Sequence, residues 1–339
     1  MNPIDVGVVG VGHLGSFHAR AYQQLDEARL VGLYDADGSK AERLAKEFGV
    51  EATTDLNQLL KMTRAVSVAV PTRAHHRIAS QCLQAGVHVL VEKPISTTLE
   101  EADDLIQQAR QADVLLQVGH IERFNPAFLA LSEMQLKPVF IESHRLAPFT
   151  PRGADVAVIL DLMIHDIDLV LALVDLPFRS VEAAGVAVLS QGEDIANARI
   201  TFTNGTTANL TASRISTKAM RKLRLFGPDT YASADFLNHA VEIFRLRRDE
   251  GPADQVQHPL GDVVQEILLS KGQTIVCQHP VLEKRDALQL QLRSFLNSVQ
   301  QHQPAVVSGE DGRRALQLAL DIVDRLTEHA RWVRASTPI

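Results

Sequence analysis

The chain has 339 residues, of which 45% are hydrophobic and 22% are charged, and its formal net charge is −7 at pH 7. This length allows two domains, each with a sizeable core. The acidic balance argues against a general role in binding nucleic acids or membrane surfaces. The two cysteines, Cys82 and Cys277, form no C-x-x-C pair, so we expect neither a disulfide framework nor a cysteine zinc site. The sequence has no signal-type leader and no apolar run of membrane-spanning length, so we expect a cytoplasmic protein.

The stretch from residue 4 to residue 35 predicts a strand, a glycine turn, a helix and a second strand. In the turn, Gly10 permits a tight reversal, Gly12 lets the backbone approach a pyrophosphate, and Gly15 lets the helix pack closely against the strand. A pyrophosphate would lie at the helix N-terminus, where unpaired N–H groups and the helix dipole favour negative charge. We expect His13 and Leu14, which complete the turn, to belong to this dinucleotide site.

Asp35 follows the second strand, about 20 residues beyond the last glycine of the turn. A carboxylate at this point accepts hydrogen bonds from both hydroxyls of an adenosine ribose and would repel a 2′-phosphate. The sequence therefore predicts NAD as the cofactor in preference to NADP. The alternative is that the glycines serve only a strand-to-helix turn.

Predicted strands and helices alternate as far as residue 121. We expect helices at 38–48, from 54, at 75–85 and at 98–112, with strands at 65–70, 87–91 and 114–118. This alternation predicts an α/β fold with a doubly wound parallel sheet, a Rossmann domain over residues 1–121. Ligands bind beyond the carboxyl ends of such strands. We expect residues 10–15, 71–72, 92–94 and 119–120 to meet there.

Beyond residue 121 the pattern changes to a series of strand-like runs at 139–146, 180–189, 196–202, 206–212, 222–226, 231–236 and 241–246. They predict a C-terminal α+β domain over residues 122–339, with an open, mainly antiparallel sheet that binds substrate and mediates oligomerisation. Helices near 161–174, 287–300 and 312–331 are candidates to cover one face of that sheet. Residues 249–281 predict an irregular excursion.

Two groups of residues could perform proton and hydride chemistry. Lys93 could hydrogen-bond a substrate hydroxyl and stabilise the alkoxide that develops during hydride loss, or it could be a solvated loop lysine. Asp161 and His165 are four residues apart and share a helix face, where the carboxylate would orient the imidazole. The alternatives are a satisfied core histidine with Asp166 and Asp168 at a solvated helix end, or a zinc or manganese site, although no third and fourth ligand is obvious.

A third group is basic. It consists of His144, Arg145, Arg152, Arg214, Lys218, Arg221 and Lys222. These cations could cradle a diphosphate, with arginine making bidentate contacts. The alternative is that they keep sheet edges soluble.

Taken together, these motifs resemble the Gfo/Idh/MocA family of sugar and cyclitol oxidoreductases over essentially the full length. The matching features are the glycine turn, Pro71-Thr72-x-x-His75, Glu92-Lys93-Pro94, Asp161-x-x-x-His165 and a late Gly309-Glu310-Asp311-Gly312. The resemblance implies that Lys93 binds the reacting hydroxyl, that His165 is the base or acid, and that Asp161 holds the substrate or orients His165. It also implies that Pro71, Thr72, His75 and Glu92 line the cofactor, and that the second domain often forms homo-oligomers.

Three segments, 119–126, 161–168 and 213–218, are similar to the branch of this family that acts on nucleotide sugars. That similarity implies oxidation of the 3-hydroxyl of UDP-N-acetylglucosamine, coupled to an aminotransferase. The implied substrate-binding residues are His120, Arg123, Asn125, Arg145, Arg152, Arg214, Lys218 and Arg221. The alternatives are a UDP-linked uronic acid, a free sugar or cyclitol, and a non-catalytic regulator that only binds the dinucleotide.

Overall fold

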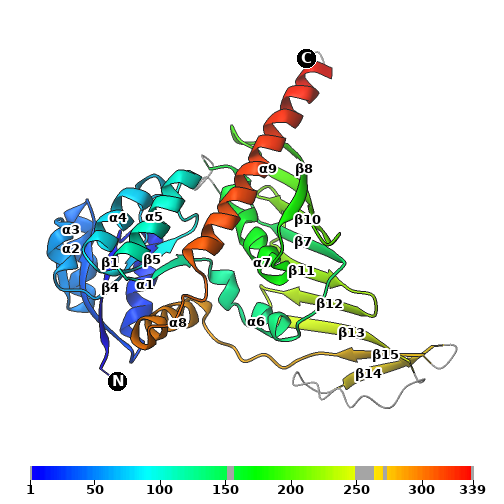
Figure 1. Ribbon diagram of the computed structural model, residues 1–339, viewed down its shortest axis with the longest axis horizontal. Helices are drawn as coiled ribbons and strands as arrows, with labels where there is room; N and C mark the ends of the chain where they lie inside the picture. The colour runs from blue at the N-terminus through cyan, green and yellow to red at the C-terminus, as the bar shows by residue number, and fades with distance from the viewer. Residues whose placement is uncertain (1, 151–155, 249–262, 270–272, 337–339) are drawn as a thin grey trace. The chain divides into compact units, whose positions relative to one another are not determined.

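The chain folds into two units, each built on its own sheet. The computed structural model describes residues 2–150, 156–248, 263–269 and 273–336 (Figure 1). Unit 1 comprises residues 1–124 and 285–317, and unit 2 comprises 125–284 and 318–339. The sequence predicted a single boundary after residue 121. The division differs because the chain returns to unit 1 after it has formed the second sheet.

Unit 1 contains a six-stranded parallel sheet with the order β3-β2-β1-β4-β5-β6. Its strands are β1 (Ile4–Val9), β2 (Ala28–Tyr34), β3 (Glu51–Thr53), β4 (Ala65–Val68), β5 (His88–Glu92) and β6 (Leu116–Gly119). This order confirms the predicted doubly wound fold. The sequence did not predict β3, since three residues are too few to display a strand pattern.

Helices cover both faces of this sheet. They are α1 (His13–Gln23), α2 (Gly38–Phe48), α3 (Leu56–Leu60), α4 (His75–Gln84), α5 (Leu99–Gln111) and α8 (Ala287–Gln301), with short 3-10 turns η1 (Thr72–Ala74) and η2 (Ile121–Phe124). Several begin where the sequence predicted them. Thr98 and Glu101 form a capping box at the start of α5, and the Asp55 carboxylate caps α3.

Helix α8 was expected among the helices that cover the antiparallel sheet, and that expectation was wrong. Its apolar residues Leu292, Phe295 and Leu296 are buried in one core with Tyr22 of α1 and strands of the parallel sheet. The apolar stripe of a helix shows that it covers something, but it does not show which sheet it covers.

Unit 2 contains a nine-stranded sheet with the order β14-β15-β13-β12-β11-β7-β10-β9-β8. Its strands are β7 (Phe140–Leu146), β8 (Phe178–Val186), β9 (Ile195–Phe202), β10 (Thr207–Ser213), β11 (Met220–Phe226), β12 (Thr230–Asp235), β13 (Ala240–Arg248), β14 (Val263–Leu268) and β15 (Gln273–Gln278). Neighbouring strands are antiparallel except for β7 and β10. The mainly antiparallel sheet is confirmed.

Strands β14 and β15 correct the prediction of an irregular excursion over residues 249–281, within the part that the structure describes. Strand β14 forms the sheet edge, and residues 265–268 are exposed. A strand with both faces in water needs no alternation of apolar and polar side chains. The sequence therefore carried no strand signal there.

Helices α6 (Pro126–Glu133), α7 (Ile164–Val174) and the later part of α9 (Gly309–Ser336) lie on one face of this sheet, as Figure 1 shows. The α9 contact is close, because a Cβ atom at Gly185 of β8 would lie 2.9 Å from a methyl carbon of Leu326. Strand residues that face the helices are buried, whereas those on the opposite face are partly exposed. The sheet is therefore open on one side.

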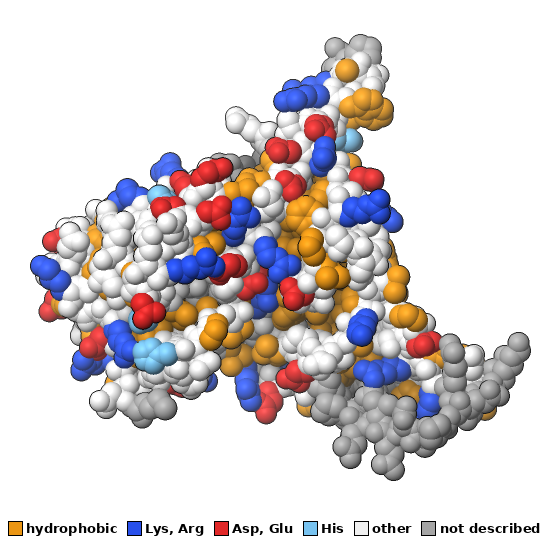
Figure 2. Space-filling model, in the orientation of Figure 1, with side chains coloured by type: hydrophobic (Ala, Val, Ile, Leu, Met, Phe, Trp, Pro, Cys, Tyr) orange, Lys and Arg blue, Asp and Glu red, His pale blue; other side chains and the backbone are white. Residues whose placement is uncertain are grey.

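The visible surface carries charges of both signs. On the face that Figure 2 shows, acidic and basic side chains of the described residues are interspersed. None of the described helices combines the length and the apolar character needed to cross a membrane.

Candidate active site

The glycine turn of unit 1 has the geometry of a dinucleotide-binding loop. Gly10 has a φ of +88°, which favours glycine, and a Cβ atom at Gly15 would lie 1.8 Å from the Gly10 carbonyl oxygen. A Cβ atom at Gly12, by contrast, would have no neighbour within 4 Å. Gly12 is the N-cap of α1, and no side chain caps that end. The space and the N–H groups at this helix N-terminus fit a pyrophosphate.

Asp35 lies beside this loop, at the end of β2. Its Oδ2 atom accepts a hydrogen bond from the Val11 N–H at 2.9 Å, and its Oδ1 atom accepts one from the Asp37 N–H at 2.9 Å. The loop residues His13 and Leu14 are exposed. The carboxylate therefore lies next to the glycine turn.

His75 joins the loops that follow β4 and β5. Its Nδ1 atom lies 2.8 Å from the Pro94 carbonyl oxygen and its Nε2 atom lies 2.9 Å from the Val70 carbonyl oxygen. The side chain is 1% exposed, and burial lowers the pKa of His75. His75 therefore ties these two loops together, and Pro71 and Thr72 lie in the first of them.

Glu92, which precedes Lys93, is a buried carboxylate. Its Oε1 atom lies 3.1 Å from the Nε2 atom of His18 in α1. Burial raises the pKa of Glu92, but the His18 hydrogen bond and the nearby positive groups outweigh it and leave the pKa below its usual value. Sequence reasoning missed His18. Its one signal was a polar residue on the apolar face of α1.

In unit 2, Asp161 and His165 lie where the sequence placed them, but not on one regular α-helix. Residues Ile159–Met163 form a π-helical turn, η3, and α7 begins directly after it. Such turns are rare and are frequently found at functional sites. Asp161 and His165 are half-buried. The alternative of a solvated helix end is wrong for Asp166 and Asp168, because both are buried.

Arg145 of β7 is paired with Asp166. Its Nε atom donates to Asp166 Oδ2 at 2.8 Å and its Nη2 atom donates to Oδ1 at 3.0 Å. Both side chains are 3% exposed. The guanidinium of Arg145, a predicted substrate contact, thus takes part in a buried pair that anchors the first turn of α7 next to His165.

Three further cations of the basic cluster, Arg214, Lys218 and Arg221, lie at the same end of the sheet. Arg214 directly follows β10, is buried, and donates from Nη2 to the Val156 carbonyl oxygen at 2.5 Å, just before η3. Lys218 and Arg221 are exposed. Since β7 and β10 are parallel, their carboxyl ends lie together, and Arg221 at the start of β11 lies opposite Arg145 near the end of β7.

The other predicted substrate residues have varied surroundings. His120 is buried at the end of β6, and Arg123 Nη2 lies 3.8 Å from Asp311 Oδ1. The Asn125 side chain caps α6 and donates to the Phe236 carbonyl oxygen at 3.2 Å, so it serves the fold of unit 2. Arg152 lies outside the described residues.

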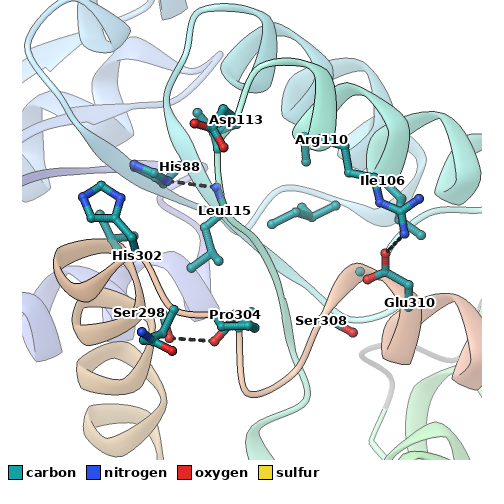
Figure 3. A pocket seen from close by; sticks show the side chains of 17 residues that line it. His88, Ile106, Arg110, Asp113, Leu115, Ser298, His302, Pro304, Ser308 and Glu310 are labelled. Carbon is teal, nitrogen blue, oxygen red and sulfur yellow. Dashed lines mark hydrogen bonds and ion pairs between the residues drawn. The ribbon is translucent and has the colours of Figure 1, made fainter.

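One cavity of unit 1 does not lie at these positions. It has a volume of about 390 Å³ and is lined by the amino ends of β5 and β6 and by parts of α5, α8 and α9 (Figure 3). His88 Nδ1 accepts from the Leu115 N–H at 2.9 Å on one side, and Arg110 pairs with Glu310 at 2.6 Å on another. None of the predicted site residues lines it. The cavity lies at the amino ends of the strands, whereas ligands in such folds bind beyond the carboxyl ends.

Metal binding has no support in the part of the chain that the structure describes. No group of three or more His, Cys, Asp or Glu side chains there could hold a metal ion.

A doubly wound sheet with this glycine loop and a following acid defines an NAD-binding oxidoreductase, and comparison with known proteins agrees. Residues 4–120 match the profile described as "Oxidoreductase family, NAD-binding Rossmann fold", and residues 139–232 match the "GFO/IDH/MocA C-terminal domain". The chain belongs to the Gfo/Idh/MocA oxidoreductase family, and NAD is its cofactor.

Its relatives are named dehydrogenases. The chain is 39% identical to UDP-N-acetylglucosamine 3-dehydrogenase of Acidithiobacillus ferrooxidans over 93% of this chain and 95% of that one. The solved structure of that enzyme has a TM-score of 0.86, at 37% identity, covering 97% and 99% of the two chains. Myo-inositol 2-dehydrogenase of Thermotoga maritima is 26% identical over 92% of this chain and 93% of its own length.

Proposed function

We propose that this protein is an NAD-dependent dehydrogenase that oxidises the 3-hydroxyl of UDP-N-acetylglucosamine to the 3-keto sugar. The observation that carries the proposal is the group of basic residues at one end of the sheet, where Arg214 and Lys218 follow β10 and Arg221 lies opposite Arg145 of β7. A UDP sugar brings two phosphates, which such cations recognise. Similarity to the Acidithiobacillus enzyme over nearly the whole chain supports the same substrate.

In this proposal, three side chains handle the reacting hydroxyl. His165 takes the proton of the hydroxyl, and Asp161, four residues earlier, orients the imidazole. Lys93 donates a hydrogen bond to the same oxygen and stabilises its developing negative charge. NAD, when bound, supplies the hydride acceptor. We infer that the loop at residues 10–15 holds the pyrophosphate and that Asp35 holds the adenosine ribose.

The basic residues of unit 2 divide between two tasks. Arg145 and Arg214 are buried and hold α7 and η3, so they position His165. Lys218 and Arg221 are exposed and are the cations proposed to contact the diphosphate. We infer that the keto product then passes to an aminotransferase, which would install the nitrogen of an amide-linked lipid A.

The open face of the unit 2 sheet supports a homo-oligomer. The rings of Phe140, Phe226, Tyr231 and Phe244 form a row across four strands on this face, with successive ring centroids 5.6, 5.0 and 5.6 Å apart. The four residues are partly exposed. An apolar row of this kind on an open sheet suits contact with a second copy of the chain.

The test is NADH formation with UDP-N-acetylglucosamine, beside the matching UDP uronic acid, free N-acetylglucosamine and inositol. An aminotransferase with glutamate is included to remove the ketone. We expect activity with the first substrate, and a loss of at least about 100-fold in kcat for Lys93→Met and for His165→Asn. The exposed Lys40→Met variant is the matched control and should keep full activity.

Activity with inositol or the free sugar alone would overturn the nucleotide-sugar substrate and leave the dehydrogenase. Lys93→Met and His165→Asn variants that keep full activity would contradict the proposed roles. Tight NAD binding without turnover of any of the four compounds would favour the regulator.

A further inference from the structure

Glu92, which directly precedes Lys93 in the chain, forms a buried pair with His18. The His18 side chain is 2% exposed, and its Nε2 atom lies 3.1 Å from Glu92 Oε1. An ionised carboxylate can only accept hydrogen bonds, so the Nε2 atom of His18 carries the proton. Among the described residues, its Nδ1 atom is buried without a hydrogen-bond partner.

Among the described residues, the ring of His18 therefore makes its hydrogen bond through Nε2 only, and that bond goes to Glu92. A hydrogen bond donated to a carboxylate favours its ionised form. Glu92 is thus a buried carboxylate that is held in its negative form.

A buried negative charge requires a positive group nearby. The titratable groups that act on Glu92 are His18 of α1, His75 of α4 and Lys93. His75 is buried, and burial lowers its pKa, which favours the neutral ring. Lys93 follows Glu92 in the chain and is partly exposed, so its ammonium group can remain hydrated on one side. Lys93 is therefore the cation that balances Glu92.

Glu92 is also confined by its surroundings. Its Oε2 atom accepts from the Lys93 N–H at 3.4 Å, and its Oε1 atom lies where a Cβ atom at Gly119 would come within 2.6 Å. The side chain therefore has little room to leave His18.

We propose that His18 is a positioning residue: it donates to Glu92 and keeps that carboxylate ionised, and the ionised carboxylate keeps Lys93 as the ammonium that binds the reacting hydroxyl. The inference rests on the role proposed above for Lys93. Loss of the donor would let Glu92 take up a proton near neutral pH, because the carboxylate is buried. Lys93 would then lose its neighbouring negative charge and would deprotonate more readily.

The experiment measures the protonation of Lys93 without any substrate. The NAD-free protein is acetylated with trace acetic anhydride across a pH series, and labelling of Lys93 is quantified by peptide mass spectrometry. We compare the wild type with His18→Leu, which removes the donor, and with His18→Gln, whose amide retains one. The control is His76→Gln, which alters a partly exposed histidine 2.6 Å from Asp104 on the same unit.

We expect the labelling midpoint of Lys93 to fall by about one pH unit in His18→Leu. His18→Gln and His76→Gln should leave it close to the wild-type value. The pH profile of kcat should follow the same order, while the Kd for NAD changes little. Glu92→Gln, which removes the charge directly, should lower the midpoint as His18→Leu does, and it serves as the test if His18→Leu does not fold.

An unchanged midpoint in folded His18→Leu, or in Glu92→Gln, would overturn the inference. A midpoint that falls equally in His18→Gln would also overturn it, because the donor would then be irrelevant. The labelling requires no sugar. A lowered midpoint in a protein that is inactive on UDP-N-acetylglucosamine would therefore support the inference and count only against the proposed substrate.

Discussion

Each unit buries one carboxylate beside a residue proposed to be catalytic, but the two carboxylates have different partners. In unit 1, Glu92 precedes Lys93 and accepts from His18. In unit 2, Asp166 follows His165 and accepts hydrogen bonds from the Nε and Nη2 atoms of Arg145. An arginine is always charged, whereas a buried histidine can be neutral. The pair in unit 2 is therefore neutral overall, whereas in unit 1 the donor to the carboxylate need not carry a charge.

This difference separates two uses of a buried carboxylate. Arg145 cancels the charge of Asp166, so that pair can act only through geometry, by fixing the start of α7. His18 leaves the charge of Glu92 in place, so that pair can act on the protonation of its neighbour Lys93. A buried carboxylate thus fixes the position of a helix in unit 2, whereas in unit 1 it favours the protonated form of Lys93.

Arg145→Met tests the neutral pair. Removing the arginine leaves Asp166 buried without its partner, and we expect the free energy of unfolding to fall by about 3–5 kcal/mol. Urea denaturation measures this change. The control is Arg224→Met, which breaks a partly exposed pair with Glu142 at 2.7 Å and should cost about 1 kcal/mol or less.

The double variant Arg145→Met, Asp166→Leu sharpens this test. Replacing both charges by apolar groups removes the uncompensated carboxylate, so most of the lost stability should return. A double variant as unstable as Arg145→Met would show that the arginine stabilises unit 2 through its packing and not through the ion pair.

Gly119→Ala tests the confinement of Glu92. The added methyl group would lie 2.6 Å from Glu92 Oε1 and would force the carboxylate or β6 to move. We expect a loss of about 1–3 kcal/mol in the free energy of unfolding, as for other overpacked sites. Gly49→Ala would not serve as the control. Gly49 has a φ of +67°, so an alanine there would strain the backbone and lower stability for a different reason.

Gly12→Ala is the better control, because its Cβ atom would project into open space. Its stability should remain within about 0.5 kcal/mol of the wild type. Equal stability of Gly119→Ala and the wild type would mean that Glu92 moves freely, which contradicts the confined pair.

The pH dependence of Glu92 gives the smallest expected effect. Its pKa is lower in the folded protein than the ordinary value of 4.5, so its contribution is present above that value and is lost as pH falls through the folded pKa. Wild type should therefore lose about 1 kcal/mol more stability than Glu92→Gln on acidification from neutral pH to about pH 3. Parallel loss in the two proteins, measured by urea denaturation at each pH, would show that the folded state does not favour the ionised form.

Local patterns were sufficient for much of unit 1. The bounds of α2 agree with the predicted 38–48, and the alternation of strands and helices predicted the doubly wound parallel sheet, although not its short strand β3. The dinucleotide loop was also predictable, because Gly10, Gly15 and Asp35 act through backbone geometry and through neighbours in the same supersecondary unit. In unit 2, the alternation of apolar and polar residues in the sequence predicted the long strands. It did not predict the edge strand β14 or the π-turn η3.

By itself, the sequence determined the Rossmann unit, the dinucleotide loop, the mainly antiparallel second sheet and the place of Lys93 after a strand of the first sheet. Only the tertiary structure decided that α8 covers the first sheet, that Arg145 pairs with Asp166 and that His18 lies against Glu92. The last two pairs join residues 21 and 74 positions apart. Their formation depends on how whole elements pack, and the local periodicity of a sequence does not encode which buried polar groups that packing brings together.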